Sequence, residues 1–465
     1  MADRHRDTLP KAQAINLEKG VYGSIAEIGA GQETARWFFR AGGAAGTIAK
    51  TISAYDMTFS DAIYGSSPRY VCRERLHAML DHEYRLILER LDTKRGSESR
   101  FFAFANTVAA RSYSHKTDGH GWLGIRFQTQ PREAFSQIDL HVNLHGQKNL
   151  QDQETLGILG VNLIYGASLL YNDPETLLLS LLDGIYRELC EIDMIDFSGP
   201  AFEKVDNRLM ALRLVEKGMS DAAMFTADGK IVQVAEQLWK KAVIVERSRF
   251  RPPTNFTINL LDCARDAFKQ DTGLGDDELV VISEMTLNNL INGQDIDVTD
   301  FLDRAELLCA MDKHVLISNY GEYYRLAQYL FRYTTMPIAL AMGALSVREI
   351  FNEKYYEDLP GGILESFGRL FKNDLCLYAS PALDPDTNNV VNLKNLDVPE
   401  NLQHLYQHLI ENRNLRPLNS INHDYLNIYS HEVLADIQNN KTGWENKLPA
   451  KVASLIKDRH LFGHA

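Results

Sequence analysis

The sequence predicts an α/β protein in which a mixed α/β domain is followed by a parallel α/β module and a helical extension. Three features support this. An apolar run ends in a glycine turn and then a helical segment over residues 24–40. From residue 279 to 355, β-branched runs alternate with helical segments, a pattern typical of a parallel sheet covered by helices. Between them, Pro252 and Pro253 interrupt both helix and strand, so we place a domain boundary there.

Length and composition limit the class of protein. A chain of 465 residues exceeds the ~250–300 at which a single core stops growing, which favours two or three domains. The hydrophobic fraction of 45% and the charged fraction of 24% are those of a globular protein. The net charge of −13, with only short and scattered basic runs, argues against nucleic acid as a partner.

Cysteine usage and hydropathy bear on location. The five cysteines are far apart and form no C-x-x-C pair, which predicts reduced thiols and a cytoplasmic protein. We expect neither a secretory signal nor a membrane-spanning helix, because no apolar stretch reaches the ~18 residues required. The expected partner is a small-molecule ligand, and a homo-oligomer is an open alternative.

The first part of the chain divides into a polar arm over residues 1–22 and a mixed α/β domain over residues 23–253. Apolar and β-branched runs predict strands, and amphipathic spacing predicts helices. The expected strands are 24–28, 101–108, 121–128, 137–144 and 190–197, and the expected helices are 34–40, 73–95, 153–170 and 173–189.

The second part divides into a parallel, Rossmann-like module over residues 254–380 and a helical extension over residues 381–465. The expected strands of the module are 279–283, 314–318 and 338–342, and its expected helices are 300–311, 320–333 and 347–355. The extension begins with a loop-like, Asn- and Asp-rich stretch.

The glycine-rich segment of residues 29–46 is the predicted ligand-binding surface. Glu27, Gly29 and Gly31 stand in an apolar-acidic-apolar-G-x-G turn that resembles the cofactor turn of S-adenosylmethionine-dependent methyltransferases. That resemblance implies that Glu27, and Asp56 further along, contact a ribose. Glu33 replaces the third glycine of both the methyltransferase and the dinucleotide pattern, so a purely structural glycine turn is the alternative.

The second half of this segment, with Gly43, Gly46 and Lys50, has glycines followed by Lys-Thr. The spacing departs from the Walker A motif, in which the lysine follows the last glycine directly, so we reject a P-loop. Gly43 and Gly46 remain candidates for cradling an anion, and Lys50 for contacting it. The sequence does not identify a cofactor; a nucleotide or magnesium is the candidate.

Acidic residues crowd the end of the strand at 190–197. Glu191 and Asp193 share one face by the two-residue strand period, an arrangement suited to magnesium or to a general acid/base pair. With Asp196 they are the candidate metal ligands, and a solvated strand face is the alternative. Asp193, Asp196, Asp206 and Arg208 are the candidate catalytic residues.

A polar turn supplies a weaker metal candidate. His115, Asp118 and His120 carry imidazole and carboxylate groups that suit zinc or iron. A turn of this composition more often satisfies its own backbone.

The parallel module contains a second local resemblance. Glu284, in the strand that begins at Leu279, and Ser318, at the end of the next strand, resemble two strand-end positions of haloacid dehalogenase-like phosphatases. Those enzymes have D-x-D-x-T after a first strand and Ser or Thr after a second. The nucleophilic and acid/base aspartates are missing here, which implies a degenerate, non-catalytic module.

Several longer runs resemble an uncharacterised bacterial protein family. They are residues 26–34, 41–65, 153–167 and 193–209. Members of that family carry conflicting genome labels, including nicotinate-nucleotide adenylyltransferase and TonB-dependent receptor. The chain has neither the H-x-G-H turn of such adenylyltransferases nor the many alternating strands of an exported barrel.

The sequence therefore favours a cytoplasmic enzyme that acts on a small phosphorylated or nucleotide-like ligand. The glycine-rich segment would hold the anion, and Asp193, Asp196 and Asp206 would supply metal or proton chemistry. A non-catalytic binding or assembly protein is the main alternative, and a methyltransferase is the weaker one.

Overall fold

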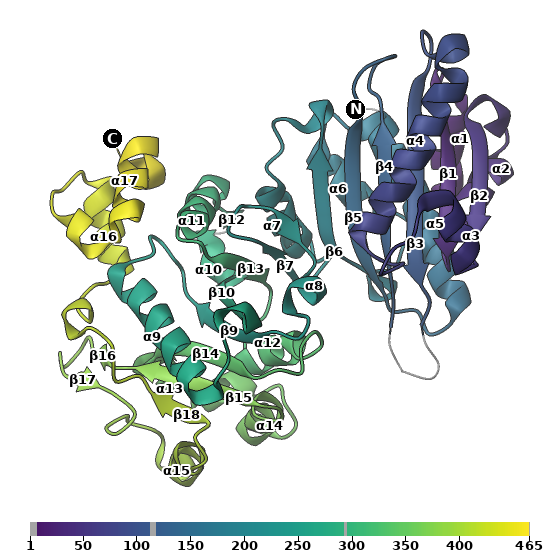
Figure 1. Cartoon of the computed structure of the whole chain (residues 1–465). Coiled ribbons are helices and arrows are strands. Elements are labelled where there is room, and N and C mark those ends of the chain that lie inside the picture. Colours follow the sequence, from purple (N-terminus) through teal and green to yellow (C-terminus); the bar gives the residue numbers. More distant parts are fainter. Residues whose placement is uncertain (1–6, 112–117, 293–294, 465) are drawn as a thin grey trace. The chain divides into compact units, whose positions relative to one another are not determined.

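The computed structural model describes residues 7–111, 118–292 and 295–464 of the chain (Figure 1). The chain forms two compact units, Met1–Ser220 and Asp221–Ala465. Pro252 and Pro253, where the sequence places a boundary, lie inside the second unit, between a central strand and the helix that follows it. We describe each unit by itself.

Unit 1 is built on a six-stranded sheet of order β2-β1-β3-β4-β5-β6. The first three strands in this order are parallel, and from β3 onward each neighbouring pair is antiparallel. The strands are β1 (Val21–Gly29), β2 (Ile48–Ala54), β3 (Arg100–Ala109), β4 (Gly119–Phe127), β5 (Ser136–Leu144) and β6 (Cys190–Ser198). All five strands expected in this domain are present, and β2 joins them at one edge.

The two faces of this sheet differ in character. Helices α2 (Thr34–Ala41), α5 (Asn149–Tyr165), α6 (Pro174–Ser180) and α7 (Asn207–Glu216) share an apolar core with residues such as Ile138, Leu140 and Val142 of β5. Helix α4 (Arg73–Arg95) crosses β3 and β4 on the other face (Figure 1). Because side chains alternate along a strand, the polar residues of β5 point toward the α4 side.

Residues expected to belong to a polar arm form helix α1 (Thr8–Leu17) instead. Ala12 and Ile15 are buried against α2 and α5. Lys11 is fully buried, and its ammonium lies 2.8 Å from Oδ1 of Asn162 and 3.0 Å from a carboxylate oxygen of Asp183. A charge paired in this way makes the segment look polar in sequence although it packs in the interior.

Unit 2 contains an eight-stranded sheet of order β18-β15-β14-β9-β10-β13-β7-β8. The strands are β7 (Ala222–Phe225), β8 (Ile231–Val232), β9 (Ala242–Arg247), β10 (Leu279–Thr286), β13 (His314–Ser318), β14 (Ile338–Gly343), β15 (Leu375–Ser380) and β18 (Leu415–Pro417). The six strands from β18 to β13 are parallel, and β7 and β8 extend one edge in antiparallel fashion.

The order of the parallel strands confirms the Rossmann-like prediction. The chain starts in the middle at β9, adds β10 and β13 on one side, and then returns to add β14, β15 and β18 on the other. This is the 3-2-1-4-5-6 order of a doubly wound sheet, in which the direction of winding reverses between β9 and β14. Strands β10, β13 and β14 are those expected from the sequence.

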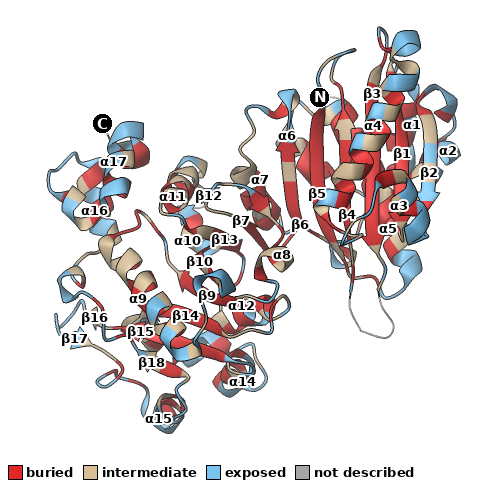
Figure 2. Ribbon diagram, in the orientation of Figure 1, coloured by how far each residue is buried: buried red, intermediate tan, exposed pale blue. Residues whose placement is uncertain are grey.

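Helices cover both faces of this sheet, and its strands are buried (Figure 2). Helix α9 (Asn255–Thr272) packs on the face that carries Ala242 and Ile244. Helices α12 (Tyr323–Leu330), α13 (Ala344–Ile350) and α14 (Gly362–Leu370) pack on the face that carries Val243 and Val245. In the C-terminal extension, α16 (Ser430–Gln438) and α17 (Ala450–Arg459) form a cluster with Leu307 of α11 (Val298–Ala310).

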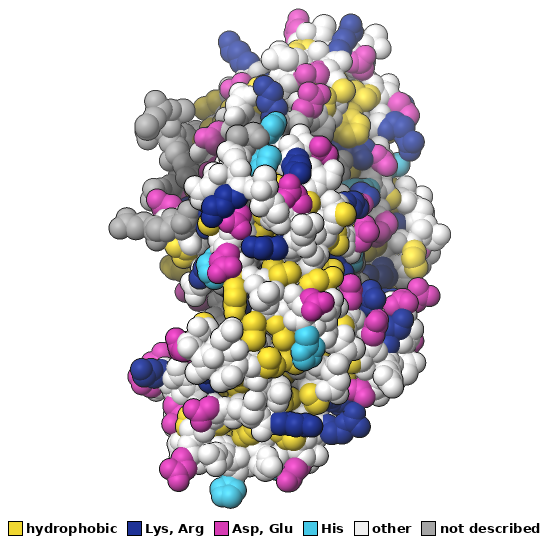
Figure 3. All heavy atoms as spheres, turned by 90° about the vertical axis from the view of Figure 1, so that its left-hand side faces the viewer, with side chains coloured by type: hydrophobic (Ala, Val, Ile, Leu, Met, Phe, Trp, Pro, Cys, Tyr) yellow, Lys and Arg dark blue, Asp and Glu magenta, His cyan; other side chains and the backbone are white. Residues whose placement is uncertain are grey.

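Three further features concern surface charge, membrane-spanning helices and cysteines. Acidic and basic side chains are interspersed on the face shown in Figure 3. Within the described ranges, no helix is both long and apolar enough to span a bilayer. All five cysteines are free thiols, and Cys309 is the only one that is not buried.

Candidate functional site

Glu27 is buried near the end of β1 and caps the helix that follows. Its carboxylate accepts hydrogen bonds from the backbone N–H of Thr34 at 3.0 Å and of Ala35 at 3.3 Å, and from Nδ2 of Asn106 at 3.2 Å. Burial raises the pKa of Glu27, while these hydrogen bonds act to lower it. The carboxylate therefore occupies the N-terminus of α2, where an anionic ligand would otherwise bind.

Gly29 and Gly31 permit a close approach of the glycine turn to β3. Gly29 has a φ of +77°, and a Cβ there would lie 2.2 Å from the carbonyl oxygen of Val108. A Cβ on Gly31 would lie 2.8 Å from Oδ1 of Asn106. These contacts account for both glycines by packing within unit 1.

The other residues of the glycine-rich segment lie elsewhere. Strands β1 and β2 are parallel, with Gly23 opposite Ile48. Gly29 ends β1, whereas Gly43 and Gly46 precede β2, so they lie at opposite ends of these two strands. One continuous anion cradle over residues 29–46 is therefore not formed.

Lys50 and Asp56 also have partners within the unit. Nζ of Lys50 lies 2.6 Å from the buried carboxylate of Glu83. Asp56 accepts a hydrogen bond of 2.8 Å from the N–H of Phe59 and so caps α3 (Met57–Tyr64). Both contacts are structural.

Asp193 belongs to a buried chain of polar groups on the α4 side of the sheet. Its Oδ1 lies 2.6 Å from Nδ1 of His141, and Nε2 of His141 lies 3.2 Å from Nδ1 of His120. A register shift in β6 places Asp193 and Met194 opposite the single residue His141. Bulges of this kind redirect a side chain and are frequent beside active sites.

Charge fixes the proton positions along this chain. An ionised Asp193 accepts a hydrogen bond from Nδ1–H of His141, whose Nε2 then accepts one from Nδ1–H of His120. Burial lowers the pKa of His120 to about 4, with a further contribution from His141. His120 is thus neutral at pH 7, and its Nε2 carries a lone pair.

Asp196 takes part in a second polar cluster on the same face. The guanidinium of Arg73, at the start of α4, contacts both Asp196 and Asp139. Nε2 of His77 lies 2.5 Å from Oδ2 of Asp139. Burial acts to raise the pKa of Asp139, but the hydrogen bond with His77 and the charge of Arg73 outweigh it, and the pKa is lowered. For Asp196 burial outweighs Arg73, and the pKa is raised.

The remaining candidates from the sequence contact other polar residues within unit 1. Glu191 accepts hydrogen bonds from Ser220 at 2.7 Å and from Asn143 at 3.2 Å. Asp206 caps α7 and holds the guanidinium of Arg208 at 2.7 Å. Among the residues that the structure describes, no group of three or more His, Cys, Asp or Glu is arranged to hold a metal ion.

The predicted metal turn is only partly visible. His115 lies outside the described residues, and Asp118 accepts a hydrogen bond of 2.6 Å from Arg111. His120, from the same turn, is the outer member of the Asp193–His141–His120 chain. Sequence reasoning did not connect these three residues, because the two histidines lie on neighbouring antiparallel strands.

The positions that resemble phosphatase strand ends are occupied by an internal ion pair. Arg247 at the end of β9 binds Glu284 with two nitrogens, at 2.8 and 3.0 Å, and Oγ of Ser318 donates to Glu284 at 2.6 Å. The strand that carries Glu284, β10, is also not the first of the parallel strands, because β9 precedes it. These three residues therefore hold the neighbouring strands β9, β10 and β13 together.

A crevice of about 300 Å³ opens in unit 2 where the strand order reverses. Its walls include Glu246 at the end of β9, Ala341 and Met342 at the end of β14, and Thr254 and Thr257 at the start of α9. In doubly wound sheets, ligands bind outside the carboxyl ends of the strands at this reversal. The crevice thus lies where the topology of the sheet predicts a binding site.

Glu246 distinguishes this crevice from a packing defect. Its side chain is buried, and its Oε2 has no hydrogen-bond partner among the described residues. Burial raises the pKa of Glu246 well above its usual value, while the charge of Lys313 acts to lower it. Burial therefore favours the neutral form of this carboxyl group.

Two buried hydroxyl groups share the face of the sheet that carries Glu246. Ser283 pairs in register with Glu246, and Ser380 pairs with Gly343, two residues beyond Ala341. The Oγ atoms of both serines also lack a hydrogen-bond partner among the described residues. Buried polar groups are normally satisfied by protein, water or ligand, and of these three atoms only Oε2 of Glu246 belongs to a residue that lines the crevice.

The sequence contained a signal for this site that we did not use. Glu246 follows the apolar run of residues 242–245, an arginine-rich stretch leads from there to Pro252-Pro253, and Thr254 then caps a long helix. An acidic residue at a strand end followed by a helix start is the local pattern of a doubly wound binding site. The module expected from the sequence has β10 as its first strand and therefore does not include β9, which carries Glu246.

Comparisons with known proteins add little. No family model and no curated protein matches the chain. A similar solved structure is that of the competence/damage inducible protein CihA from Agrobacterium tumefaciens, at 16% identity and a TM-score of 0.24, which covers 36% of this chain and 94% of that one. Another is a putative nicotinate-nucleotide adenylyltransferase from Vibrio parahaemolyticus, at 13% identity and a TM-score of 0.20, covering 48% and 97%. Scores this low carry no argument about function.

Proposed function

We propose that unit 2 binds a small phosphorylated or nucleotide-like ligand in the crevice between β9 and β14, and that the protein is an enzyme acting on that ligand. The observation that supports the proposal most directly is Glu246, a buried carboxyl group without a partner at the reversal of the strand order. A group of this kind costs folding free energy unless a ligand uses it.

The walls of the crevice suit the parts of a nucleotide. In the first turn of the 18-residue helix α9, the N–H groups of Asn255 and Phe256 have no carbonyl partner within the helix and favour a phosphate, whereas the N–H and the hydroxyl of Thr257 already contact Oγ1 of Thr254. A neutral Glu246 can donate a hydrogen bond to a phosphate or accept one from a sugar hydroxyl. Phe256 and Met342 supply apolar surface for a base. The volume is at the lower end of the ~300–1,000 Å³ range of ligand pockets, which favours a mononucleotide over a dinucleotide.

The same groups give the site a chemical capability. A protonated Glu246, the form that its burial favours, can transfer its proton to a leaving group, as a general acid does. His431, from the start of α16, also lines the crevice and can accept or return a proton. Acid catalysis by Glu246 is the role that its environment favours.

Calorimetric titration with adenosine 5′-monophosphate, adenosine and inorganic phosphate tests the binding step. We expect the monophosphate to bind more tightly than either part alone, because the crevice contacts both. Glu246→Leu should weaken binding by about tenfold or more, since it removes one hydrogen bond to a polar ligand. Ala341→Phe should abolish binding by filling the crevice.

A matched control is Glu357→Gln, which changes an exposed glutamate of the same unit outside the crevice. It should leave binding unchanged. Equal affinities in the wild-type and Glu246→Leu proteins, or no binding of any of the three compounds, would contradict the proposal.

A second candidate function is supported by a separate observation. Arg247, Glu284 and Ser318 satisfy one another, so the phosphatase-like positions offer no free reactive group. This favours a non-catalytic binding or assembly protein with a degenerate phosphatase-like module. Mass photometry and a turnover assay together distinguish an enzyme from an assembly protein. A homo-oligomer that still assembles in the Ala341→Phe variant, and that shows no turnover, supports an assembly protein.

A further inference from the structure

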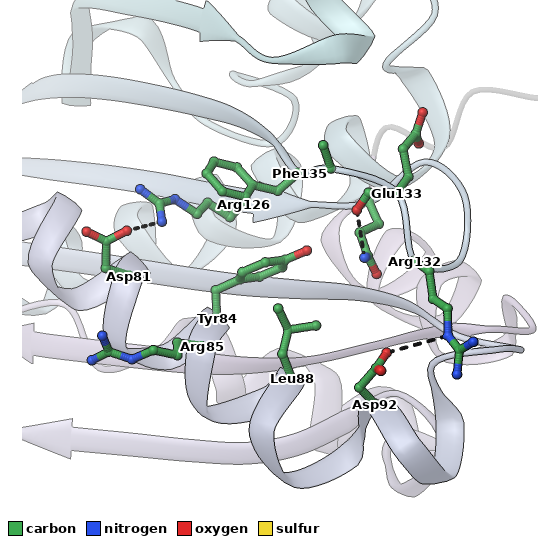
Figure 4. Close-up of a pocket in the computed structure, with 11 residues that line it drawn as sticks. Asp81, Tyr84, Arg85, Leu88, Asp92, Arg126, Arg132, Glu133 and Phe135 are labelled. Carbon is green, nitrogen blue, oxygen red and sulfur yellow. Dashed lines mark hydrogen bonds and ion pairs between the residues drawn. The ribbon is translucent and has the colours of Figure 1, made fainter.

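Unit 1 contains a larger pocket that is separate from the crevice of unit 2. It has a volume of about 840 Å³ and lies between α4 and the connection from β4 to β5 (Figure 4). Tyr84 and Leu88 come from α4, Arg126 from β4, and Arg132 and Phe135 from the connection. One rigid helix and one strand end thus hold the pocket open.

The hydroxyl of Tyr84 is the central polar group of this pocket. The side chain is 6% exposed, its ring packs edge-on against Phe135 with centroids 5.4 Å apart, and its hydroxyl has no hydrogen-bond partner among the described residues. Burial raises the pKa of Tyr84 to about 12, although the charge of Arg126 acts to lower it. The hydroxyl is therefore protonated near neutral pH and available as a donor.

The charged side chains of the pocket fall into two groups. Arg126 is held in place, because it contacts Asp81 and Gln137 and stacks on Phe135 at 4.3 Å from the ring centroid. Arg132 is held loosely, because its nearest acid, Asp92, is 3.9 Å away.

Arg85 and Glu133 extend this division. Arg85 approaches its nearest acid, Glu89, only at 3.9 Å, and its side chain is exposed. The carboxylate of Glu133 is already occupied by Thr129 and the N–H of Gln130. Arg85 and Arg132 therefore keep unused donor capacity, and Asp92 keeps unused acceptor capacity beside Arg132.

We propose that this pocket binds a small aromatic anion, with its carboxylate, sulfonate or phosphate oxygens accepting from the Tyr84 hydroxyl and the Arg132 guanidinium. Phe135 and Leu88 form the apolar surface for the ring, and Phe135 is 38% exposed. Arg132 adopts a φ of +64°, a backbone conformation that few non-glycine residues take up, and it places this guanidinium at the pocket rim. The proposal is independent of ligand binding by unit 2.

A pair of fluorescent probes tests the proposal. 8-Anilinonaphthalene-1-sulfonate is an aromatic anion, and N-phenyl-1-naphthylamine is the same ring system without the sulfonate. We expect the anion to bind more tightly. Tyr84→Phe should weaken binding of the anionic probe by about tenfold, because it removes a hydrogen bond to a charged group, and should leave binding of the neutral probe unchanged.

Arg132→Asn is the second variant, because asparagine tolerates a positive φ. It should weaken the anion by about threefold, the effect of an exposed ion pair. Tyr186→Phe, an exposed tyrosine of unit 1 outside the pocket, is the matched control and should change neither probe.

The two variants also separate binding from folding. The Tyr84 hydroxyl has no partner, so Tyr84→Phe should melt at the wild-type temperature. The proposal is overturned if both probes bind equally, or if Tyr84→Phe and Arg132→Asn leave the affinity for the anion unchanged. A loss of affinity accompanied by a lowered melting temperature in Tyr84→Phe would also overturn it, since the hydroxyl would then be a structural group.

Discussion

The imidazole of His141 and the carboxylate of Asp193 form a buried hydrogen bond of 2.6 Å at a bulge in β6. The other oxygen of Asp193 accepts from Nδ2 of Asn143 at 3.0 Å. Both oxygens therefore face donors, and the carboxylate is matched to its surroundings. This match is the reason that Asp193 tolerates burial.

Asp193→Asn should destabilise unit 1 by about 2–3 kcal/mol, because the new amide group faces a donor from either His141 or Asn143. Amide hydrogen exchange of β5 and β6 measures the change within this unit. Asp118→Asn, an exposed aspartate, should change stability by less than about 0.5 kcal/mol. Equal protection in the two variants would contradict a matched carboxylate.

The low pKa of His120 predicts a pH dependence of stability. In the unfolded chain the imidazole binds a proton near pH 6.5, whereas in the folded chain it does so only near pH 4. Between these values the unfolded state binds more protons, so the stability of unit 1 should fall as the pH is lowered from about 6.5 to 4.

His120→Gln should reduce this fall. The measurement is the urea midpoint of unit 1 followed by hydrogen exchange at several pH values. A pH profile identical to that of the wild-type protein would show that His120 does not titrate as its burial requires. Titration of the imidazole by NMR gives the pKa directly.

The raised pKa of Glu246 predicts the opposite dependence in unit 2. The folded state retains the proton above the pH at which the unfolded glutamate loses it, so stability should decline as the pH rises from about 4.5 toward neutrality. Glu246→Gln removes the titration and should make unit 2 more stable than the wild-type protein at pH 7, because an amide has no proton to lose and the decline with rising pH disappears.

Glu357→Gln is the control for this measurement, since an exposed glutamate should leave the profile unchanged. If Glu246→Gln lowers stability at pH 7, the carboxylate has a favourable partner, and the argument for a ligand weakens. A gain in stability combined with weaker ligand binding is the expected signature of a functional group.

The cap formed by Glu27 predicts a structural role for the glycine turn. Glu27→Ala should destabilise unit 1 by about 1–2 kcal/mol, because the first-turn amides of α2 lose their acceptor. Gly29→Ala should do at least as much, since it places a Cβ against Val108 and strains a positive φ. Thermal unfolding measures both changes. Normal stability of the Gly29→Ala variant would contradict a structural role for this glycine and favour a ligand-binding role for the turn.

Most elements were predictable from local patterns. The alternation of Ile138, Leu140 and Val142 with polar residues identified β5, and the amphipathic spacing of residues 73–95 identified α4 with its observed bounds. Thr8–Leu17 was missed, because burial of Lys11 depends on Asn162 and Asp183, which lie far away in the sequence. Local patterns cannot reveal a charge that is paired across the fold.

The sites were less predictable than the elements. Asp193 stays a predicted site residue, and the sequence did not reveal its contact with His141 and, through it, with His120, because these residues come from neighbouring strands. The two halves of the glycine-rich segment lie at opposite ends of the strands, because β1 and β2 are parallel and the segment connects the end of one to the start of the other.

The sequence by itself determined the α/β class, most strands and helices, and the parallel, helix-covered character of the C-terminal module, because hydrophobic period and strand–helix alternation are local properties. Only the tertiary structure decided the strand order and formed the crevice in which we propose that a ligand binds. Strand order is set by long-range pairing, and it is the reversal between β9 and β14 that brings Glu246, Ala341 and the start of α9 around one crevice.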